Sequence, residues 1–283
     1  MRISILCWLL SIFVVITSPA IAQQENEEAA KEGGDSTGTD PRGFTSKLMP
    51  YYSHVELNNG VEVDQVNLFG MYAFNSKIAM TYDLPVYKDI EGPSGQSESG
   101  IGDLGLRIFY KPDATQFEKS SHIFGAEVTL PTATSTNTFI GNSTVPFSVL
   151  GDDTVIVSPM YVYVRDIKLL SPGFVAFMNF YDFDVEKGTD GKNVSRYRGR
   201  WFLMQPLSRP GPGLLDGIYL LPELQPVYDF EKDDNQFSLW VAPELGKMLP
   251  WGAAYIKPGF GIISDDETDR DWTFELGFRY FFN

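Results

Sequence analysis

The chain ends in WTFELGFRYFFN, residues Trp272 to Asn283. Every second position from Trp272 to Phe282 carries a bulky apolar side chain, whereas Glu275 and Arg279 belong to the opposite set. Because successive side chains of a strand point to opposite faces, this pattern predicts a strand with one apolar face and one polar face. A soluble sheet has such a strand when the apolar face packs on a core. A membrane barrel has one when that face contacts lipid, so the rest of the sequence has to decide.

The amino terminus predicts export. Arg2 precedes the apolar run Ile3 to Ile16, and Ala20-Ile21-Ala22 forms a small-x-small cleavage site. A run of this length is short for a membrane helix, so we expect residues 1–22 to be a secretory signal peptide that is cleaved after Ala22. The alternative is an anchor helix that is not cleaved.

Composition narrows the class of protein. Cys7 is the single cysteine and lies in the expected signal, so the mature chain is expected to hold no disulfide and no thiolate metal site. The formal net charge is −15, which argues against nucleic acid as a partner because phosphate binding needs clustered lysines and arginines. The acidic stretches 231–236 and 265–271 lack the ligand spacing and the glycine of a calcium loop. We interpret them as solvated loops, with divalent-cation binding as the alternative, and we expect no cofactor.

The residues after the signal divide into two regions. Gln23 to Arg42 contain no aromatic or branched aliphatic residue, so they have too little apolar surface to offset the entropy lost on ordering. We expect residues 23–43 to be a disordered acidic segment. Aromatic residues and alternating patterns then continue from 44 to 283, which indicates one β domain.

Segments of alternating polarity recur through this domain, each about ten residues long, as tilted strands that cross a bilayer require. Soluble strands more often end after about five or six residues. We predict an all-β protein, a single transmembrane antiparallel up-and-down β-barrel of about 12 strands. Residues 131–153 would form the main surface loop. The prolines inside these segments each remove a ladder hydrogen bond and are expected at bulges or strand ends: Pro159, Pro222, Pro243 and Pro258. The expected strands are 48–57, 61–74, 77–88, 102–111, 120–130, 154–165, 173–183, 194–206, 217–230, 236–246, 251–263 and 271–282.

Two of these segments resemble a known family. GIGDLGLRIFYK (Gly100 to Lys111) and IFGAEVTLPTAT (Ile123 to Thr134) are similar to consecutive strands of the outer-membrane barrels named for the meta-pathway of phenol degradation. The resemblance implies a channel or porin-like protein that admits small hydrophobic or aromatic molecules, and it brings no catalytic residues. One departure concerns the barrel-assembly machinery, which commonly reads a terminal Phe, whereas here Phe282 is penultimate and Asn283 is last.

Charged residues on the polar strand faces are candidates for the lumen. Arg196, Arg198 and Arg200 share one face of a strand, and each would cost about 2–4 kcal/mol against lipid at mid-bilayer. They either form an anion-attracting ladder that sets selectivity, or pair with lumen carboxylates such as Asp83 and hold the wall together. The lumen and selectivity candidates are Arg196, Arg198, Arg200, Glu127, Glu244, Glu275, Arg279, Asp103 and Arg107.

Aromatic residues near the ends of the last two strands predict a girdle at the lipid headgroups. These residues are Trp251, Trp272, Tyr280 and Phe282, and ordinary sheet packing is the alternative. Trp240 and Phe281 are expected to point inward and to narrow the lumen.

The two histidines, His54 and His122, limit the candidates for an enzyme. Ser53 and His54 are adjacent in a strand, so they point to opposite faces and cannot share a proton. His122 falls on the apolar face of its strand. The chain lacks the G-x-S-x-G, H-E-x-x-H and phosphate-loop motifs. We expect no enzymatic activity.

Together these patterns predict an outer-membrane channel for passive uptake of small molecules. The expected partners are outer-membrane lipid, lipopolysaccharide, the barrel-assembly machinery and a small-molecule solute, with no nucleic acid. Two alternatives stay open, an outer-membrane acyl hydrolase and a soluble periplasmic β-sandwich binding module.

Overall fold

The structure, a computed structural model, describes residues 37–112, 120–134, 139–140, 143–144, 154–167, 173–185, 193–231, 236–264 and 270–282. The expected signal peptide, residues 23–36 and most of the expected surface loop 131–153 lie outside these ranges, as do the centres of both acidic loops. Among the described residues, no helix is long and apolar enough to cross a membrane.

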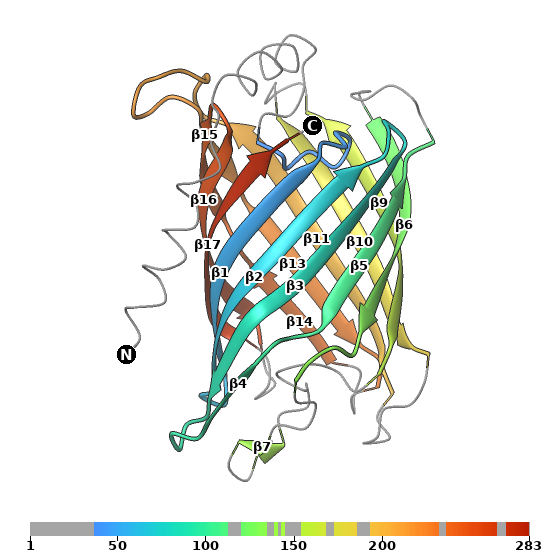
Figure 1. Cartoon of the computed structure of the whole chain (residues 1–283), viewed down its shortest axis with the longest axis vertical. Coiled ribbons are helices and arrows are strands. Elements are labelled where there is room, and N and C mark those ends of the chain that lie inside the picture. The colour runs from blue at the N-terminus through green and yellow to red at the C-terminus, as the bar shows by residue number, and fades with distance from the viewer. Residues whose placement is uncertain are drawn as a thin grey trace.

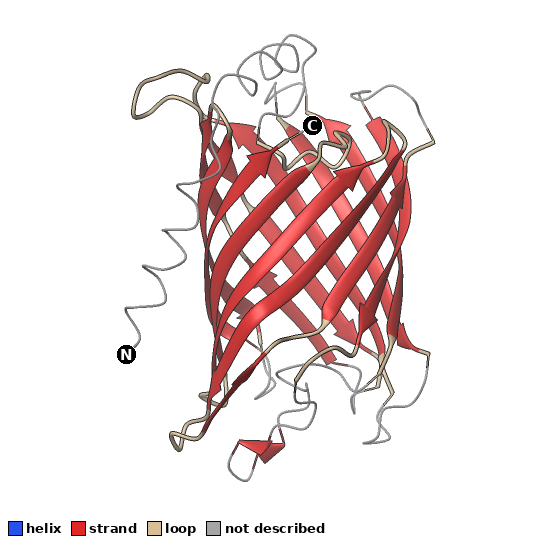
Figure 2. Ribbon diagram, viewed as in Figure 1, coloured by secondary structure: helices blue, strands red, loops and turns tan. Residues whose placement is uncertain are grey.

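In the described part of the chain, the strands form one closed antiparallel barrel of 12 strands, which confirms the predicted fold class (Figures 1 and 2). Strands that follow one another in the sequence are neighbours in the barrel, and the first strand pairs with the last to close it. The strands run obliquely around the wall, as the closure of a sheet into a barrel requires (Figure 2).

Most barrel strands are continuous, and their bounds lie close to the predicted ones. They are β1 (Lys47–Leu57), β2 (Glu62–Ala73), β3 (Ile78–Glu91), β6 (Ser120–Leu130), β9 (Ile156–Asp166), β10 (Phe174–Asp184), β11 (Ser195–Pro206), β16 (Gly252–Ile263) and β17 (Arg270–Phe281). The remaining strands are each interrupted once and consist of β4 (Ser97–Gly100) with β5 (Leu104–Tyr110), β12 (Ile218–Leu221) with β13 (Glu223–Asp229), and β14 (Gln236–Val241) with β15 (Glu244–Leu249). Outside the barrel, β7 (Phe139–Ile140) pairs with β8 (Ser143–Thr144).

Two of the four strand prolines occupy the interruptions. Pro222 separates β12 from β13, and Pro243 lies between β14 and β15. The expectation of a bulge or strand end is wrong for the other two, because Pro159 faces Ala126 and Pro258 faces Phe274 in regular register. A proline in an antiparallel strand removes one donor, and the unbroken pairs on both sides hold the ladder in place.

The last strand, β17, explains the alternation with which the sequence ends. Trp272, Leu276 and Phe278 are each about two-fifths exposed on the outside of the barrel, whereas Arg279 is buried inside it. Large apolar side chains are exposed in the same way on most other barrel strands. A protein core therefore does not cover this face, and a band of apolar side chains surrounds the barrel.

Part of the barrel interior is a packed apolar core. Phe44 from the segment before β1 is 6% exposed and lies 6.2 Å, ring centre to ring centre, from Phe109 of β5. Around it lie buried apolar side chains of several strands, Ala79, Ile123, Met160, Val162, Val164, Phe174, Ala176, Phe180, Phe202, Met204 and Leu221. Phe44 precedes β1, and the start of β1 pairs with the end of β17, so this core includes the end of the barrel where the carboxy terminus lies (Figure 1).

The segment 37–46 differs from the expected disorder. Residues 37–43 belong to the stretch predicted to be disordered, yet Thr37, Asp40 and Arg42 are buried. The composition of this segment gives it no core of its own, and the barrel wall supplies the contacts. The structure therefore contradicts the expected disorder for residues 37–43, and the prediction for 23–36 lies outside the described residues.

Candidate functional site

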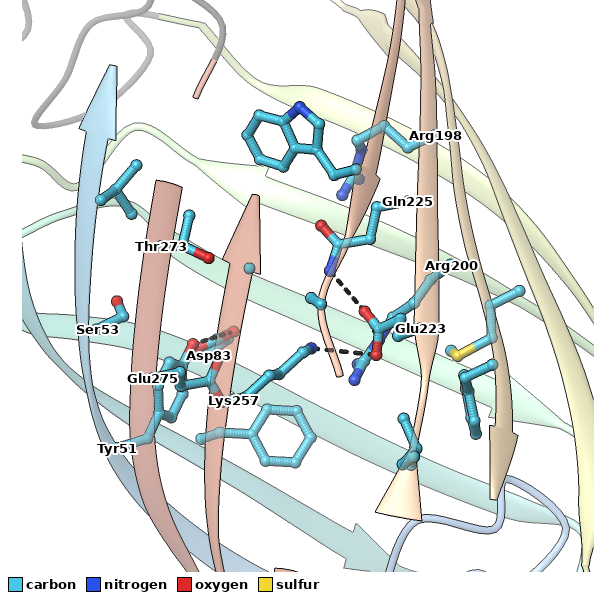
Figure 3. Close-up of a pocket in the computed structure, with 18 of the residues that line it drawn as sticks. Tyr51, Ser53, Asp83, Arg198, Arg200, Glu223, Gln225, Lys257, Thr273 and Glu275 are labelled. Atoms are coloured by element: carbon cyan, nitrogen blue, oxygen red, sulfur yellow. Dashed lines mark hydrogen bonds and ion pairs between the residues drawn. The ribbon is translucent and has the colours of Figure 1, made fainter. Parts of the chain in front are cut away.

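A cavity of about 730 Å³ lies inside the barrel. Its wall includes side chains from most of the strands, and the segment 37–46 contributes residues at one end. Figure 3 shows that labelled side chains of this cavity come from opposite parts of the wall and point toward one another. A closed sheet puts every second side chain on the inside, so the strand alternation determines which residues line the cavity.

Arg42 holds the segment 37–46 inside the barrel. Its guanidinium forms ion pairs with Asp40 at 2.6 Å and with Asp166 of β9 at 2.7 Å, and it lies 5.4 Å from the ring centre of Phe174. Burial alone would lower the pKa of Arg42, but the adjoining carboxylates of Asp40 and then Asp166 raise it above its ordinary value. Lys111, fully buried, donates a hydrogen bond to the Arg42 carbonyl at 2.9 Å.

The segment also has one position that only glycine suits. Gly38 has a φ of 67°. A Cβ at this position would come within 2.5 Å of the Phe281 ring. Phe281 thus points inward as predicted and packs against this segment.

The arginines of β11 share carboxylates with their neighbours. Arg196 and Arg198 both bind Asp182 of β10, at 2.9 and 2.6 Å, and Arg198 also reaches Glu127 of β6 at 3.0 Å. Arg107 of β5 forms an ion pair with the other oxygen of Glu127. Three guanidinium groups therefore surround two carboxylates.

A second cluster continues from the same strand. Arg200 of β11 and Lys257 of β16 both bind Glu223 of β13, at 2.8 and 3.1 Å. The amide of Gln225 donates a further hydrogen bond to this carboxylate. Figure 3 shows Arg200, Glu223, Gln225 and Lys257 converging on one part of the wall.

Arg279 of β17 is enclosed in a third cluster. Its two terminal nitrogens bind the two oxygens of Glu244, at 2.7 and 2.8 Å, and one of them also bonds to the Tyr219 hydroxyl at 2.7 Å. Arg279 and Glu244 are both nearly inaccessible, so this pair braces the wall instead of facing water.

The exposed fractions of the side chains show which charges face the cavity. Arg196, Arg198 and Arg200 are 18%, 31% and 43% exposed, although they point into the barrel. Their partners Asp182 and Glu223 are fully buried. The cations thus form the surface of this wall and the carboxylates lie behind them.

Carboxylates line the cavity away from the β11 arginines. Asp83 of β3 accepts hydrogen bonds from the Tyr51 hydroxyl, at 3.3 Å to each oxygen, and Glu275 of β17 accepts one from the Tyr255 hydroxyl. Tyr51, Asp83 and Glu275 lie together in Figure 3, away from Arg198 and Arg200. Among the described residues, neither carboxylate forms an ion pair.

Asp103 differs from its prediction. It lies between β4 and β5, where its carboxylate accepts a hydrogen bond from the Ala133 backbone at 2.9 Å. The interruption of this barrel strand turns Asp103 toward the connection after β6 instead of toward the cavity. Strand alternation alone could not predict the break.

The aromatic candidates occupy two ends of the barrel. Trp251 lies near Tyr280, and Tyr280 stacks on Phe282, with ring centres 6.4 Å apart in both pairs. Trp272, at the other end of β17, lies 4.7 Å from the His54 ring and donates a hydrogen bond to Glu56. Their role as a girdle stays a prediction.

Trp240 lines the cavity, as the sequence indicated for an inward-pointing residue. The guanidinium of Arg270 lies 3.9 Å from the centre of its ring. Arg270 begins β17, and the start of β17 pairs with the end of β1. The segment 37–46 precedes the start of β1, so Arg270 and Trp240 lie at the opposite end of the cavity.

Neither histidine forms its described hydrogen bond with the serine next to it in the sequence. His54 Nδ1 lies 2.8 Å from Asp64, and His122 Nδ1 lies 2.7 Å from the Tyr161 hydroxyl. Ser53 lines the cavity, on the opposite face from His54, as strand geometry predicts.

Several members of the charged clusters were not predicted. They are Asp182, Glu223 and Lys257, which lie in strands, and Arg42, which lies in the segment before β1. Asp182 alternates with the outward-facing Tyr181, so its inward position is readable from the sequence. Glu223 directly follows Pro222 and Lys257 directly precedes Pro258. Because each proline made the strand pattern around it uncertain, the inward position of these two residues was not predicted.

Comparisons with known proteins identify the fold. No protein-family profile matches the chain, and no curated protein matches it either. Among solved structures, an outer membrane channel from Pseudomonas putida F1 is similar, with 14% identity and a TM-score of 0.61 over 88% of this chain and 98% of that one. The NanC porin is similar with 8% identity and a TM-score of 0.54, over 84% of this chain and 100% of that one. The chain thus has the fold of outer-membrane barrels.

Proposed function

We propose that the protein is an outer-membrane channel for the passive movement of small molecules. One observation carries the proposal: the exterior of the closed barrel is apolar, whereas its interior holds a cavity of about 730 Å³ lined with charged side chains. An apolar exterior fits lipid, and a charged interior holds water. Of the two similar structures, one is named a channel and the other a porin, which supports the same function for this barrel.

The location in the outer membrane belongs to this proposal. It is supported by the barrel fold and by the sequence of residues 1–22, which is typical of a signal peptide cleaved after Ala22. Lipid and lipopolysaccharide would then surround the apolar band. The barrel-assembly machinery would insert the chain.

The solute class is part of the proposal as well. The resemblance of Gly100–Lys111 and Ile123–Thr134 to the phenol meta-pathway barrels supports small hydrophobic or aromatic solutes. Phe69, Phe180 and Trp240 line the cavity and offer apolar surface beside the charged clusters.

The test has two stages. In the first, the washed outer-membrane fraction is run on SDS electrophoresis with and without heating. A closed barrel resists SDS until it is heated, so we expect faster migration of the unheated protein. In the second, the purified chain is added to planar bilayers, and we expect discrete steps of ionic current. Protein that shows the heat-dependent shift yet carries no current would contradict the channel.

A further inference from the structure

The loop 207–217 connects β11 to β12 and exposes two adjacent leucines. Leu214 and Leu215 are 85% and 75% exposed, whereas the large apolar side chains on the outside of the barrel strands are less exposed than either. A single exposed leucine is common on a protein surface, but two neighbouring ones at one tip form a patch that the chain itself does not cover.

Hydrogen bonds within the loop hold it in one shape. The Ser208 hydroxyl donates to the Leu215 carbonyl at 2.7 Å, and the Gly213 N–H donates to the Asp216 carboxylate at 2.8 Å. The Asp216 N–H donates in return to the Gly213 carbonyl at 3.1 Å. A Cβ at Gly213 would come within 2.8 Å of the Asp216 carboxylate, so the chain turns closely around this side chain.

The neighbouring strand supports the tip of the loop. Lys247 of β15 donates hydrogen bonds to the carbonyls of Gly213 and Leu214. Pro210 and Pro212 each fix one backbone torsion, which lowers the entropy that the loop loses on ordering. An ordered loop that keeps two leucines in water forgoes the free energy that their burial would supply. Its construction therefore suits a partner outside the chain.

The direction of the loop indicates the kind of partner. Figure 1 shows it as the orange loop that extends sideways from the rim of the barrel beside β15, instead of along the barrel axis. On the wall next to it, Leu245 of β15 and Ile256 of β16 are exposed and belong to the apolar band. The two leucines thus continue the surface that, in the proposed function, contacts lipid.

We infer that the loop 207–217 is a membrane anchor, which inserts Leu214 and Leu215 into the interfacial region of a phospholipid bilayer. Apolar side chains gain by leaving water at the boundary between headgroups and acyl chains. The exposed Arg209 near the start of the loop has the charge to bind a lipid phosphate. The inference rests on the proposed location in the outer membrane. The loop adds a lipid contact beyond the barrel wall, which fixes the depth and limits the tilt of this rim.

The position of the loop favours phospholipid over lipopolysaccharide. The long connection from β6 to β9 leaves the opposite end of the barrel, as extracellular loops do. The end that carries the loop 207–217 then faces the periplasmic leaflet, which consists of phospholipid. A protein partner in the periplasm would be met by a loop that extends along the barrel axis, whereas a sideways loop lies over the surrounding bilayer.

Site-specific fluorescence in lipid vesicles tests the inference. Cys7 is the single cysteine, so Cys7→Ser gives a full chain without a thiol, into which Leu214→Cys is introduced and labelled with the fluorophore nitrobenzoxadiazole. The protein is reconstituted into phosphatidylcholine vesicles with or without lipid that carries a nitroxide on its acyl chain. Two further labelled variants are controls: Ile108→Cys on the apolar band, and Ser94→Cys in the exposed turn at the opposite end.

The label at position 214 should behave like the label on the apolar band. We expect the nitroxide lipid to quench it about threefold more strongly than the label at position 94, with emission shifted to the blue. Quenching no stronger than at position 94 would overturn the inference and show that the tip stays in water.

A charge at the second leucine tests the insertion itself. Leu215→Asp should lower the quenching at position 214 to the value at position 94, because a carboxylate at the tip has to stay hydrated. The heat-dependent shift on electrophoresis checks that the variant is folded. Unchanged quenching in the folded variant would contradict insertion by the two leucines together.

The control at position 108 separates this inference from the proposed function. Quenching at 108 without quenching at 214 leaves the barrel in the membrane and overturns the anchor. Quenching at neither position overturns the location in a membrane, and the anchor with it. Quenching at both positions in a protein that carries no current overturns the channel and supports the anchor.

Discussion

The barrel interior has two regions that are stabilised in different ways. Around Phe44 it is a packed apolar core that resembles the interior of a soluble protein. Around Arg198 and Arg200 it is a ring of ion pairs that borders the cavity. The difference shows that one barrel interior can contain an apolar core and a charged cavity wall. Apolar packing around Phe44 anchors the segment 37–46 together with the buried ion pairs of Arg42, whereas the arginines of β11 are partly exposed to the cavity.

The largest expected effect comes from the most enclosed ion pair. Glu244→Gln leaves the Arg279 guanidinium buried without a counter-charge, which should lower the free energy of unfolding by about 3–5 kcal/mol. The temperature at which the unheated electrophoretic form is lost should fall. Asp64→Asn, an exposed carboxylate outside the barrel, is the control. An equal effect of the two variants would show that the ion pairs do not brace the interior.

Phe44→Ala tests the apolar region. It removes a buried ring from the core, a change that costs about 3–5 kcal/mol in a well-packed site. Because Phe44 belongs to the segment before β1, we expect the loss to appear as release of that segment, while the barrel stays closed. Limited proteolysis should then cut between residues 37 and 46 with the heat-dependent shift unchanged. A barrel that opens together with the segment would mean that the two regions are not separable.

Arg200→Gln tests the charged region from the cavity side. Arg200 is 43% exposed and Lys257 still accompanies Glu223, so we expect the free energy of unfolding to fall by about 1 kcal/mol or less. The reversal potential across a salt gradient should shift toward cation selectivity, because the cavity surface loses a positive charge. An unchanged reversal potential would assign the β11 arginines to bracing alone.

The smallest effect is expected outside the barrel. His122→Ala removes a hydrogen bond to the exposed Tyr161 and should change the free energy of unfolding by no more than about 0.5 kcal/mol. Together with His54→Ala it should leave the lipid products of the membrane unchanged. A loss of released fatty acid in either variant would favour the acyl hydrolase over the channel.

Much of the fold was predictable because strand alternation is a local property. The segment 120–130 was predicted with the bounds that β6 has, since Phe124, Ala126, Val128 and Leu130 alternate with Gly125, Glu127 and Thr129. The interruptions at Pro222 and Pro243 were predictable in part. A proline signals a lost hydrogen bond, but its consequence depends on the neighbouring strands, and Pro159 causes no break.

The residues that point into the lumen were largely predictable, but their ion-pair partners were less so. Alternation indicated that Arg198 points inward, but the height at which it meets Asp182 depends on the stagger between strands, which no single strand encodes. The ordered part of the segment 37–46 is a similar case. Its composition is that of a disordered chain, and Phe44 and Arg42 become fixed only because the barrel supplies the Asp166 carboxylate and an apolar pocket.

The pairing of β1 with β17 sets an order of events during biogenesis. The ring is complete only when the last strand has been synthesised and meets the first, so a truncated chain has two unpaired edges and no finished wall. The segment 37–46 directly precedes β1 and lies inside the finished ring. It therefore has to fold inward before the seam closes or enter afterwards through a mouth. The residues at this seam thus influence the timing of assembly as well as the shape of the protein.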